Sequence, residues 1–246
     1  MQKHIIPNLS VDCVIFGFDS KDLNVLLVER TLFDKKKKSV VFSDYTLTGN
    51  HVHVGENPDD AAIRILNNLI GSHEIYLEQF HTFGDVNRLS GKNDQNWIHS
   101  LGLDISDHVV TVGYFSLIDS TCFNIAEHNE RKVRWFPVNC LPELGFDHEA
   151  ILRKALEQLQ LKFKYEPIGF ELLAEKFTLT QVQRLYEAIL GTKLDPRNFR
   201  KKLSQMEFII PLNEKQQAVR HKPAQLFIYS RDVYEKTRKE KFGYLI

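Results

Sequence analysis

The sequence predicts an α+β protein made of two domains. Its 246 residues exceed the span of about 100 to 200 residues that one domain usually takes. Runs with β-strand composition dominate the first part of the chain, whereas two short amphipathic helices and a hairpin follow Glu166-Pro167. Acidic residues exceed basic ones by five in residues 1–164, and basic residues exceed acidic ones by five in residues 165–246. We therefore expect a first domain over 1–147, a linker helix over 148–165 and a basic second domain over 166–246.

The composition is that of a globular protein, with 43% hydrophobic and 26% charged residues. No apolar run reaches the roughly 18 residues of a membrane-spanning helix, and the N-terminus lacks the pattern of a secretory signal. A cytoplasmic protein with no membrane partner is expected. Cys13, Cys122 and Cys140 lack Cys-x-x-Cys spacing, so they are interpreted as small buried residues and not as a disulfide or zinc site.

The first domain begins with a predicted hairpin. β-rich runs at residues 11–18 and 24–29 flank Asp19, Ser20 and Asp22, which favour a turn. The four lysines at 35–38 follow in a predicted surface loop. Further strands are expected at 78–83, 109–118 and 133–138, and the polar segment 85–108 predicts a long loop.

Residues 57–71, NPDDAAIRILNNLIG, predict a helix. Asn57 suits the N-cap, Pro58 the first helical position and Gly71 the end. Apolar residues recur four apart in two rows, so the helix is expected either to face protein on both rows or to line an apolar cavity with one. The rows are Ala62, Leu66 and Ile70, and Ala61, Ile65 and Leu69. A second helix is predicted over 148–164, with Ile151, Ala155, Leu159 and Phe163 on one side.

The sequence of the second domain predicts a winged helix-turn-helix. A helix capped by Thr178 or Thr180 ends at Gly191, and a short turn leads to a basic helix over 196–206 that is capped by Asp195. Two strands at 207–214 and 225–230 then enclose a basic segment. Helix, turn, basic helix and two-stranded wing is the order of a winged helix.

Double-stranded DNA is the expected partner of this domain, because basic and amide side chains on a helix can contact phosphates and base edges. A surface helix with ordinary charges is the alternative. The candidate DNA contacts are Thr180 and Gln181 on the first helix, Arg197, Asn198, Arg200, Lys201 and Lys202 on the second, and Arg220, His221 and Lys222 in the wing.

The segment 50–71 resembles the motif of the Nudix family, G-x5-E-x7-R-E-U-x-E-E-x-G-U, where U is aliphatic. Glu56, Arg64 and Gly71 match that spacing. The resemblance implies an α/β/α sandwich around a mixed sheet. In that family the helix glutamates bind the magnesium that neutralises a diphosphate and helps to supply hydroxide.

The metal-binding glutamates of the motif are missing from this sequence. Ile65, Asn68 and Leu69 stand at the three helix positions, and Asn50 replaces the first glycine. Two aliphatic side chains and one neutral amide cannot hold magnesium in their place. We therefore expect no metal, no cofactor and no catalytic residue, with Glu56 and Arg64 forming a structural ion pair.

Two alternatives keep a metal or a reaction. His51 and His53 have the spacing of a metal-binding pair, but no third ligand lies nearby in the sequence, so an extended segment with polar side chains is preferred. A divergent hydrolase of a nucleotide sugar would need ligands outside the motif, such as Glu74, Glu78 or the histidines.

A Nudix-like domain followed by the segment 166–203 resembles the Nudix-related transcriptional regulators, over residues 11–229. In that family the first domain senses an effector, usually without hydrolysing it, and the winged helix binds an operator as a homodimer. Some members respond to ADP-ribose and control NAD metabolism, while others sense a sugar such as arabinose. The missing carboxylates favour a sugar or nucleotide-sugar effector and control of carbohydrate catabolism. Arg30, Glu56 and Arg88 are candidate effector contacts. The alternatives are an ADP-ribose-responsive regulator and a protein-interaction module without DNA contact.

Overall fold

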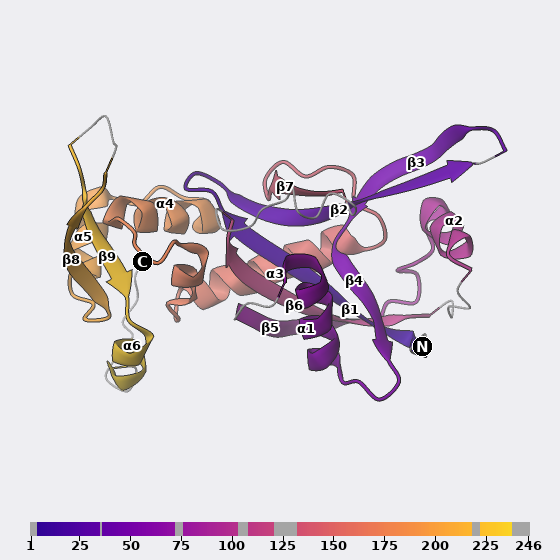
Figure 1. Ribbon diagram of the computed structural model, residues 1–246, viewed down its shortest axis with the longest axis horizontal. Helices are drawn as coiled ribbons and strands as arrows, with labels where there is room; N and C mark the ends of the chain where they lie inside the picture. Colours follow the sequence, from indigo (N-terminus) through magenta and orange to yellow (C-terminus); the bar gives the residue numbers. More distant parts are fainter. Residues whose placement is uncertain are drawn as a thin grey trace.

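The computed structural model describes residues 4–34, 36–71, 76–102, 108–120, 132–217 and 222–237. Figure 1 shows an elongated molecule with a sheet domain at one end and a small helical domain at the other. No helix in these described ranges is long and apolar enough to span a membrane.

A mixed sheet organises the first domain. Its order is β3-β2-β1-β6-β5, with β4 paired with β1 and β7 with β2. The β1 and β6 strands run parallel, and their neighbours in the sheet are antiparallel. The strands are β1 Ile5–Phe18, β2 Leu23–Asp34, β3 Ser39–Thr46, β4 Thr48–His53, β5 Tyr76–Phe83, β6 Val110–Asp119 and β7 Val133–Pro137.

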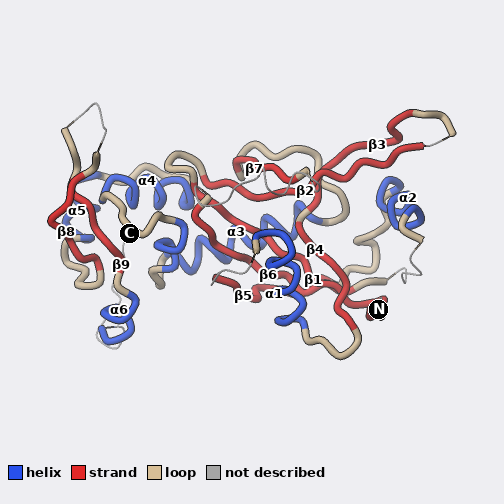
Figure 2. Tube along the Cα trace, in the orientation of Figure 1, coloured by secondary structure: helices blue, strands red, loops and turns tan. Residues whose placement is uncertain are grey.

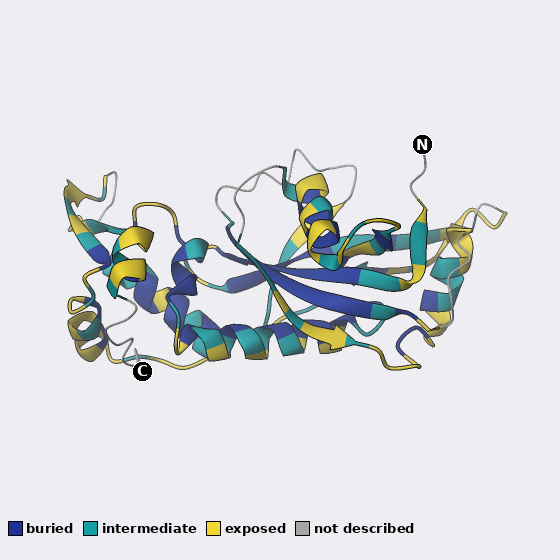
Figure 3. Cartoon of the chain, turned by 90° about the horizontal axis from the view of Figure 1, so that it is seen from below, coloured by how far each residue is buried: buried dark blue, intermediate teal, exposed yellow. Residues whose placement is uncertain are grey.

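Alternation along β1 divides the core between the two faces of the sheet. Val11, Cys13 and Ile15 join the core beneath α1 (Pro58–Ile70), whereas Val14 and Phe16 join the core beneath α3 (His148–Phe163). Figure 3 shows the buried strands between a short helix on one face and a long helix on the other. The predicted α/β/α sandwich with a mixed sheet is therefore confirmed.

The α1 helix has the ends that the sequence predicts. Asn57 Oδ1 accepts the backbone N–H of Asp60 at 2.8 Å, and Gly71 ends the helix with a φ of 86°. Both apolar rows face protein, because Ala61, Ala62, Ile65, Leu66 and Leu69 are buried.

The second domain confirms the predicted order of helix, turn, helix and wing (Figure 2). Thr178 and Gln181 form a capping box at the start of the first helix, and Asp195 Oδ1 accepts the N–H of Asn198 at the start of the second. Phe199 and Leu203 anchor the second helix in the core. The elements are the short 3-10 helix η2 Ile168–Leu172, α4 Leu179–Leu190, α5 Pro196–Leu203, β8 Ile209–Lys215, β9 Gln225–Tyr229 and α6 Arg231–Thr237.

The α3 helix joins the two domains through a shared core. Ile151, Ala155, Leu159 and Phe163 are fully buried on one side of it, as predicted. The Phe163 ring lies 5.0 Å from the Tyr186 ring in α4, and Gln160 Nε2 donates to the Ile189 carbonyl at 2.8 Å. One apolar cluster runs from the sheet into the winged helix, so the core shows no break at which one domain ends and the next begins. The expected domain limits of 1–147, 148–165 and 166–246 stay a prediction.

Two sequence expectations were wrong, and one strand was missed. Residues 92–100 form a helix, α2 (Lys92–Ser100), inside the segment expected to be a loop. The strand β3 was not predicted, and it extends with β2 as a hairpin beyond the rest of the sheet (Figure 1). Cys140 is exposed, whereas Cys13 is buried as expected and Cys122 lies outside the described residues.

Candidate functional site

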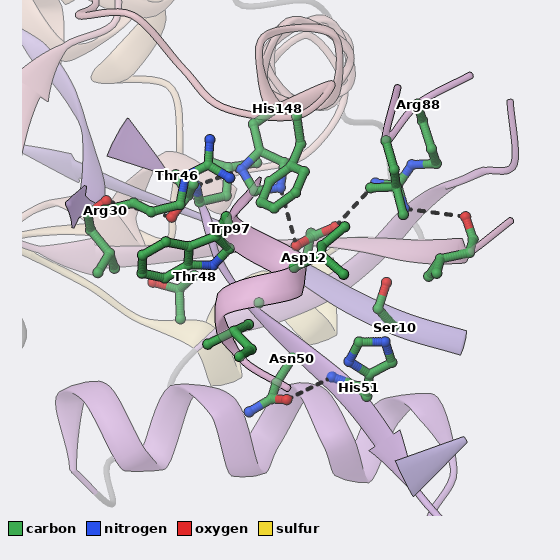
Figure 4. Close-up of a pocket in the computed structure, with 18 of the residues that line it drawn as sticks. Ser10, Asp12, Arg30, Thr46, Thr48, Asn50, His51, Arg88, Trp97 and His148 are labelled. Atoms are coloured by element: carbon green, nitrogen blue, oxygen red, sulfur yellow. Dashed lines mark hydrogen bonds and ion pairs between the residues drawn. The ribbon is translucent and has the colours of Figure 1, made fainter. Parts of the chain in front are cut away.

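A cavity of about 400 Å³ opens in the sheet domain (Figure 4). The elements that carry its lining residues meet at the end of this domain that is farther from the winged helix (Figure 1). That volume is within the range of small-molecule sites. Its walls come from β1, β2, β4, the last turn of α1, α2 and the start of α3. The polar and aromatic lining side chains include Ser10, Asp12, Arg30, Thr48, His51, Arg88, Trp97, Phe146 and His148.

Arg30 is buried in the cavity wall, where two carboxylates bind its guanidinium group. Its Nε and Nη2 donate to Asp44 at 2.8 and 2.6 Å, and Nη2 also donates to Asp94 Oδ1 at 2.7 Å. Burial alone would lower the pKa of Arg30, but these hydrogen bonds raise it, so the guanidinium stays charged. Among the described residues, Nη1 of Arg30 has no hydrogen-bond partner and remains available as a donor.

Three aromatic rings complete the surroundings of Arg30. The guanidinium carbon lies 4.4 Å from the ring centre of Phe146, 5.1 Å from that of Phe42 and 5.6 Å from that of Trp97. Trp97 and Asp94 both belong to α2. Arg30 is therefore the group that holds α2 against the cavity.

Arg88 forms a second buried ion pair at the opposite wall. Its Nε and Nη2 donate to Asp147 at 2.9 and 2.7 Å, and Nη2 lies 3.5 Å from Asp12 Oδ2. Burial tends to lower the pKa of Arg88, but Asp147 and Asp12 raise it overall. Because Asp147 precedes α3 directly, Arg88 ties the cavity to the start of that helix.

His148 lies between the two arginines and is fixed in one tautomer. Its Nδ1 accepts the backbone N–H of Leu47 at 2.9 Å, so the proton of the neutral ring is on Nε2, 3.6 Å from Asp12 Oδ1. Burial lowers the pKa of His148 and keeps the ring neutral. With Nδ1 occupied, the ring has no free lone pair, so His148 can position a ligand but cannot accept its proton.

The Nudix-like motif adjoins this cavity without its metal ligands. Leu69, at one glutamate position, lines the cavity, whereas Ile65 is buried in the core and Asn68 is exposed. Within the described residues, no three His, Cys, Asp or Glu side chains are grouped as metal ligands, and Glu74 lies outside those residues. Only one of the three positions at which the motif carries its glutamates therefore faces the cavity.

Glu56 and Arg64 form the expected ion pair. Arg64 Nε and Nη2 donate to the two oxygens of Glu56 at 2.7 and 2.8 Å, and Glu56 also accepts the N–H of His53 at 2.9 Å. Of the three candidate effector contacts, Arg30 and Arg88 line the cavity, and Glu56 is not among its lining residues. An effector contact by Glu56 stays a prediction.

Replacing Glu56 with glutamine should lower the free energy of unfolding at neutral pH but not at strongly acidic pH. The hydrogen bonds from Arg64 lower the pKa of Glu56 from an ordinary 4.5 to about 2. A carboxyl with a depressed folded-state pKa stabilises the fold above its unfolded pKa and loses that contribution as pH falls toward the folded value. The difference in unfolding free energy between wild type and Glu56→Gln should therefore shrink from pH 5 to pH 2. Glu149→Gln, which alters an exposed pair, is the control; a difference independent of pH would contradict the ion pair's role.

The winged helix presents one basic surface from α4 and α5. Arg197, Asn198, Arg200 and Lys201 are exposed, and Lys202 is half-buried. Arg200 Nη2 donates to Thr180 Oγ1 at 3.1 Å, which joins the two helices on this surface. The side chain of Gln181 is bound in the capping box. Lys222 is exposed, and Arg220 and His221 lie outside the described residues.

The sequence did not reveal Asp12, Trp97 or His148 as cavity residues. Asp12 carried a signal, because it is a lone charge inside the otherwise apolar run VDCVIFGF. Trp97 lies in the segment that was expected to be a loop. His148 lies at the start of a helix that was predicted from its apolar side alone. Their side chains meet only after the sheet and α3 are assembled.

The fold defines a domain of Nudix type that contains a cavity and is followed by a winged helix domain. The NUDIX domain profile matches residues 7–159, and the profile of the NrtR DNA-binding winged helix domain matches residues 169–229. The chain belongs to the Nudix family, and its two domains make it a member of the NrtR-type transcriptional regulators.

Individual relatives agree with this assignment. The ADPR responsive transcriptional repressor NtrR of Acinetobacter baylyi is 27% identical over 233 residues, which cover 93% of this chain and 84% of that protein. The crystal structure of Shewanella oneidensis NrtR complexed with a 27mer DNA is similar, with a TM-score of 0.71 at 25% identity over 92% of this chain and 95% of that one. A MutT/nudix family protein from Enterococcus faecalis has a similar fold, with a TM-score of 0.61 at 22% identity over 94% and 89% of the two chains.

Proposed function

We propose that this protein is a transcriptional regulator that binds operator DNA through α4, α5 and the wing, and that ADP-ribose in the sheet-domain cavity controls this binding. One observation carries the proposal. The α3 helix begins at the ligand-sized cavity and ends against α4 of the domain that exposes the basic helix α5. The relative named as ADPR responsive supports the choice of effector, and the relative crystallised with DNA supports the choice of partner.

The cavity has the chemistry that an ADP-ribose effector needs. Arg30 and Arg88 can face a diphosphate, and Arg30 Nη1 is an unused donor among the described residues. The Trp97 ring offers a surface on which a base can stack. Both guanidinium groups are already paired with carboxylates, so they can serve a diphosphate as hydrogen-bond donors and not as unpaired charges.

The sugar effector and the role in carbohydrate catabolism expected from the sequence are not supported by the comparisons. That expectation equated the loss of the motif's carboxylates with loss of diphosphate binding. We infer another route, in which buried arginines from β2 and from the loop before α2 donate hydrogen bonds to the phosphates.

The route from effector to DNA runs through α3. Three consecutive residues at the start of α3 are hydrogen-bonded to groups around the cavity. Phe146 bonds to Asp94, Asp147 bonds to Arg88, and His148 bonds to Leu47. Phe146 has a φ of 58°, which is unfavourable for a side chain with a Cβ and can relax in a second state. The 16 residues of α3 span about 24 Å and end against α4. An effector shifts DNA binding only if it favours one position of this helix.

We also propose that the DNA-binding form is a homodimer, as the family resemblance implies. Two-fold symmetric operators match two-fold symmetric proteins. A DNA-binding role requires the protein to share a compartment with DNA, in agreement with the cytoplasmic location expected from the sequence. Light scattering of the purified protein with and without duplex DNA tests the stoichiometry.

The experiment that tests the proposed function is a titration of fluorescent duplex from upstream of its own gene, with and without ADP-ribose. A shift of DNA affinity by ADP-ribose supports the proposal. The second candidate function is a divergent hydrolase, which the Nudix fold itself favours. Magnesium-dependent turnover of ADP-ribose that disappears in Glu56→Gln would establish the hydrolase in place of a sensor.

A further inference from the structure

One corner of the cavity is made of hydrogen-bond acceptors. His51 in β4 is paired directly with Ser10 in β1, and Asp12 is two residues further along β1 on the same face (Figure 4). All three side chains line the cavity.

His51 holds a buried lone pair that nothing in the described part of the chain uses. The backbone oxygen of Pro7 interacts with the ring, and we assign the ring proton to the nitrogen on that side, Nδ1. The other nitrogen, Nε2, is buried and has no hydrogen-bond partner among the described residues. Burial lowers the pKa of His51, so the ring is neutral and Nε2 is an acceptor. A buried acceptor without a partner is costly and calls for a donor from elsewhere.

Asp12 adds a carboxylate that can accept further hydrogen bonds. Its contacts to His148 and Arg88 are 3.6 and 3.5 Å long, which are ion-pair distances and not short hydrogen bonds. The Gly49 backbone faces Asp12, and a Cβ at that position would collide with its carboxylate. A carboxylate accepts hydrogen bonds and repels phosphate, so this corner suits neutral hydroxyl groups and not the charged part of a ligand.

We propose that Ser10, Asp12 and His51 bind the hydroxyl groups of a ribose, and that His51 determines the preference for an effector with a terminal ribose. This inference rests on the proposed function, because it assigns one end of ADP-ribose to the acceptor corner. The base then lies toward Trp97, and the diphosphate lies beside Arg30 and not beside Asp12. An effector hydroxyl donates to Nε2 of His51, and the Ser10 hydroxyl can either donate or accept beside it.

Calorimetry with two ligands and three proteins tests the assignment. ADP-ribose and ADP differ in the terminal ribose. The wild type should bind ADP-ribose about tenfold or more tightly than ADP, which is the effect of one or two well-placed hydrogen bonds. His51→Phe keeps a flat ring but removes the acceptor, so it should bind ADP as the wild type does and lose most of the preference for ADP-ribose. His53→Phe makes the same change two residues along β4, outside the cavity lining, and should keep the preference.

Each outcome decides the inference. An unchanged preference in folded His51→Phe would overturn it while leaving ADP-ribose sensing intact. A wild type that binds neither nucleotide would overturn both the inference and the proposed function. If His51→Phe unfolds, Ser10→Ala carries the test, because Ser10 is only half-buried and its hydroxyl serves the same corner. A reduced preference in Ser10→Ala supports the inference, and an unchanged one overturns it.

Discussion

Replacing Arg197 and Lys201 together with alanine should weaken binding to duplex DNA by about 100-fold or more, since each charge-assisted hydrogen bond contributes at least about 1.5 kcal/mol. The two residues are four apart on α5, so they lie on one face of the helix. Phe199 and Leu203 occupy the opposite, buried side. The variant should therefore keep the fold, and its loss should appear in DNA affinity alone.

Salt dependence distinguishes lost phosphate contacts from other causes. Each phosphate contact contributes about 0.9 to the slope of log affinity against log salt, so the double variant should lower that slope by about two. Arg153→Ala with Lys154→Ala removes two positive charges from α3 and is the matched control. Equal losses in the two double variants would show that net charge, and not the α5 surface, governs binding.

Replacing Arg30 with methionine should lower the free energy of unfolding by about 3 to 5 kcal/mol, the cost of breaking a buried ion pair by removing one partner. Only 3% of the Arg30 side chain is exposed, and the change leaves Asp44 and Asp94 without their shared cation. Urea unfolding followed by circular dichroism measures the effect. Arg134→Met, on an exposed position of β7, should change the unfolding free energy by no more than about 0.5 kcal/mol.

A double variant tests the reason for this loss. If uncompensated carboxylates cause it, adding Asp94→Asn to Arg30→Met should recover part of the stability, because one buried charge disappears. Asp94→Asn alone should loosen α2, since Asp94 also accepts the N–H of Phe146 at 3.0 Å. Additive losses in the double variant would contradict the account of Arg30 as the shared partner.

Local sequence patterns predicted the parts of the fold that depend on local chemistry. The α1 helix begins at Asn57 and ends at Gly71, because a side-chain cap and a positive φ act within a few residues. The winged helix followed for the same reason, with caps at Thr178 and Asp195. By contrast, α2 has few apolar residues and no side-chain cap at Gly91, and its contacts with Arg30 come from a distant strand. No local pattern contains those contacts.

The candidate site was predicted in part for similar reasons. Arg30 and Arg88 were selected and line the cavity, but the partners that fix them, Asp44 and Asp147, are 14 and 59 residues away in the sequence. The charge state of the cavity depends on those partners. The motif by itself shows only that the metal ligands are missing, and for this reason the sequence favoured a sugar over a diphosphate.

The proposed function links the binding of a nucleotide in the sheet-domain cavity to the binding of DNA on the winged helix. The most direct measurement is the dissociation constant for operator duplex across a series of ADP-ribose concentrations, at fixed salt. Binding linkage predicts a saturable shift of about 5-fold or more in DNA affinity, and an equal shift of ADP-ribose affinity when DNA is the added ligand. A DNA affinity that stays constant while calorimetry shows the cavity saturated with ADP-ribose would contradict the account.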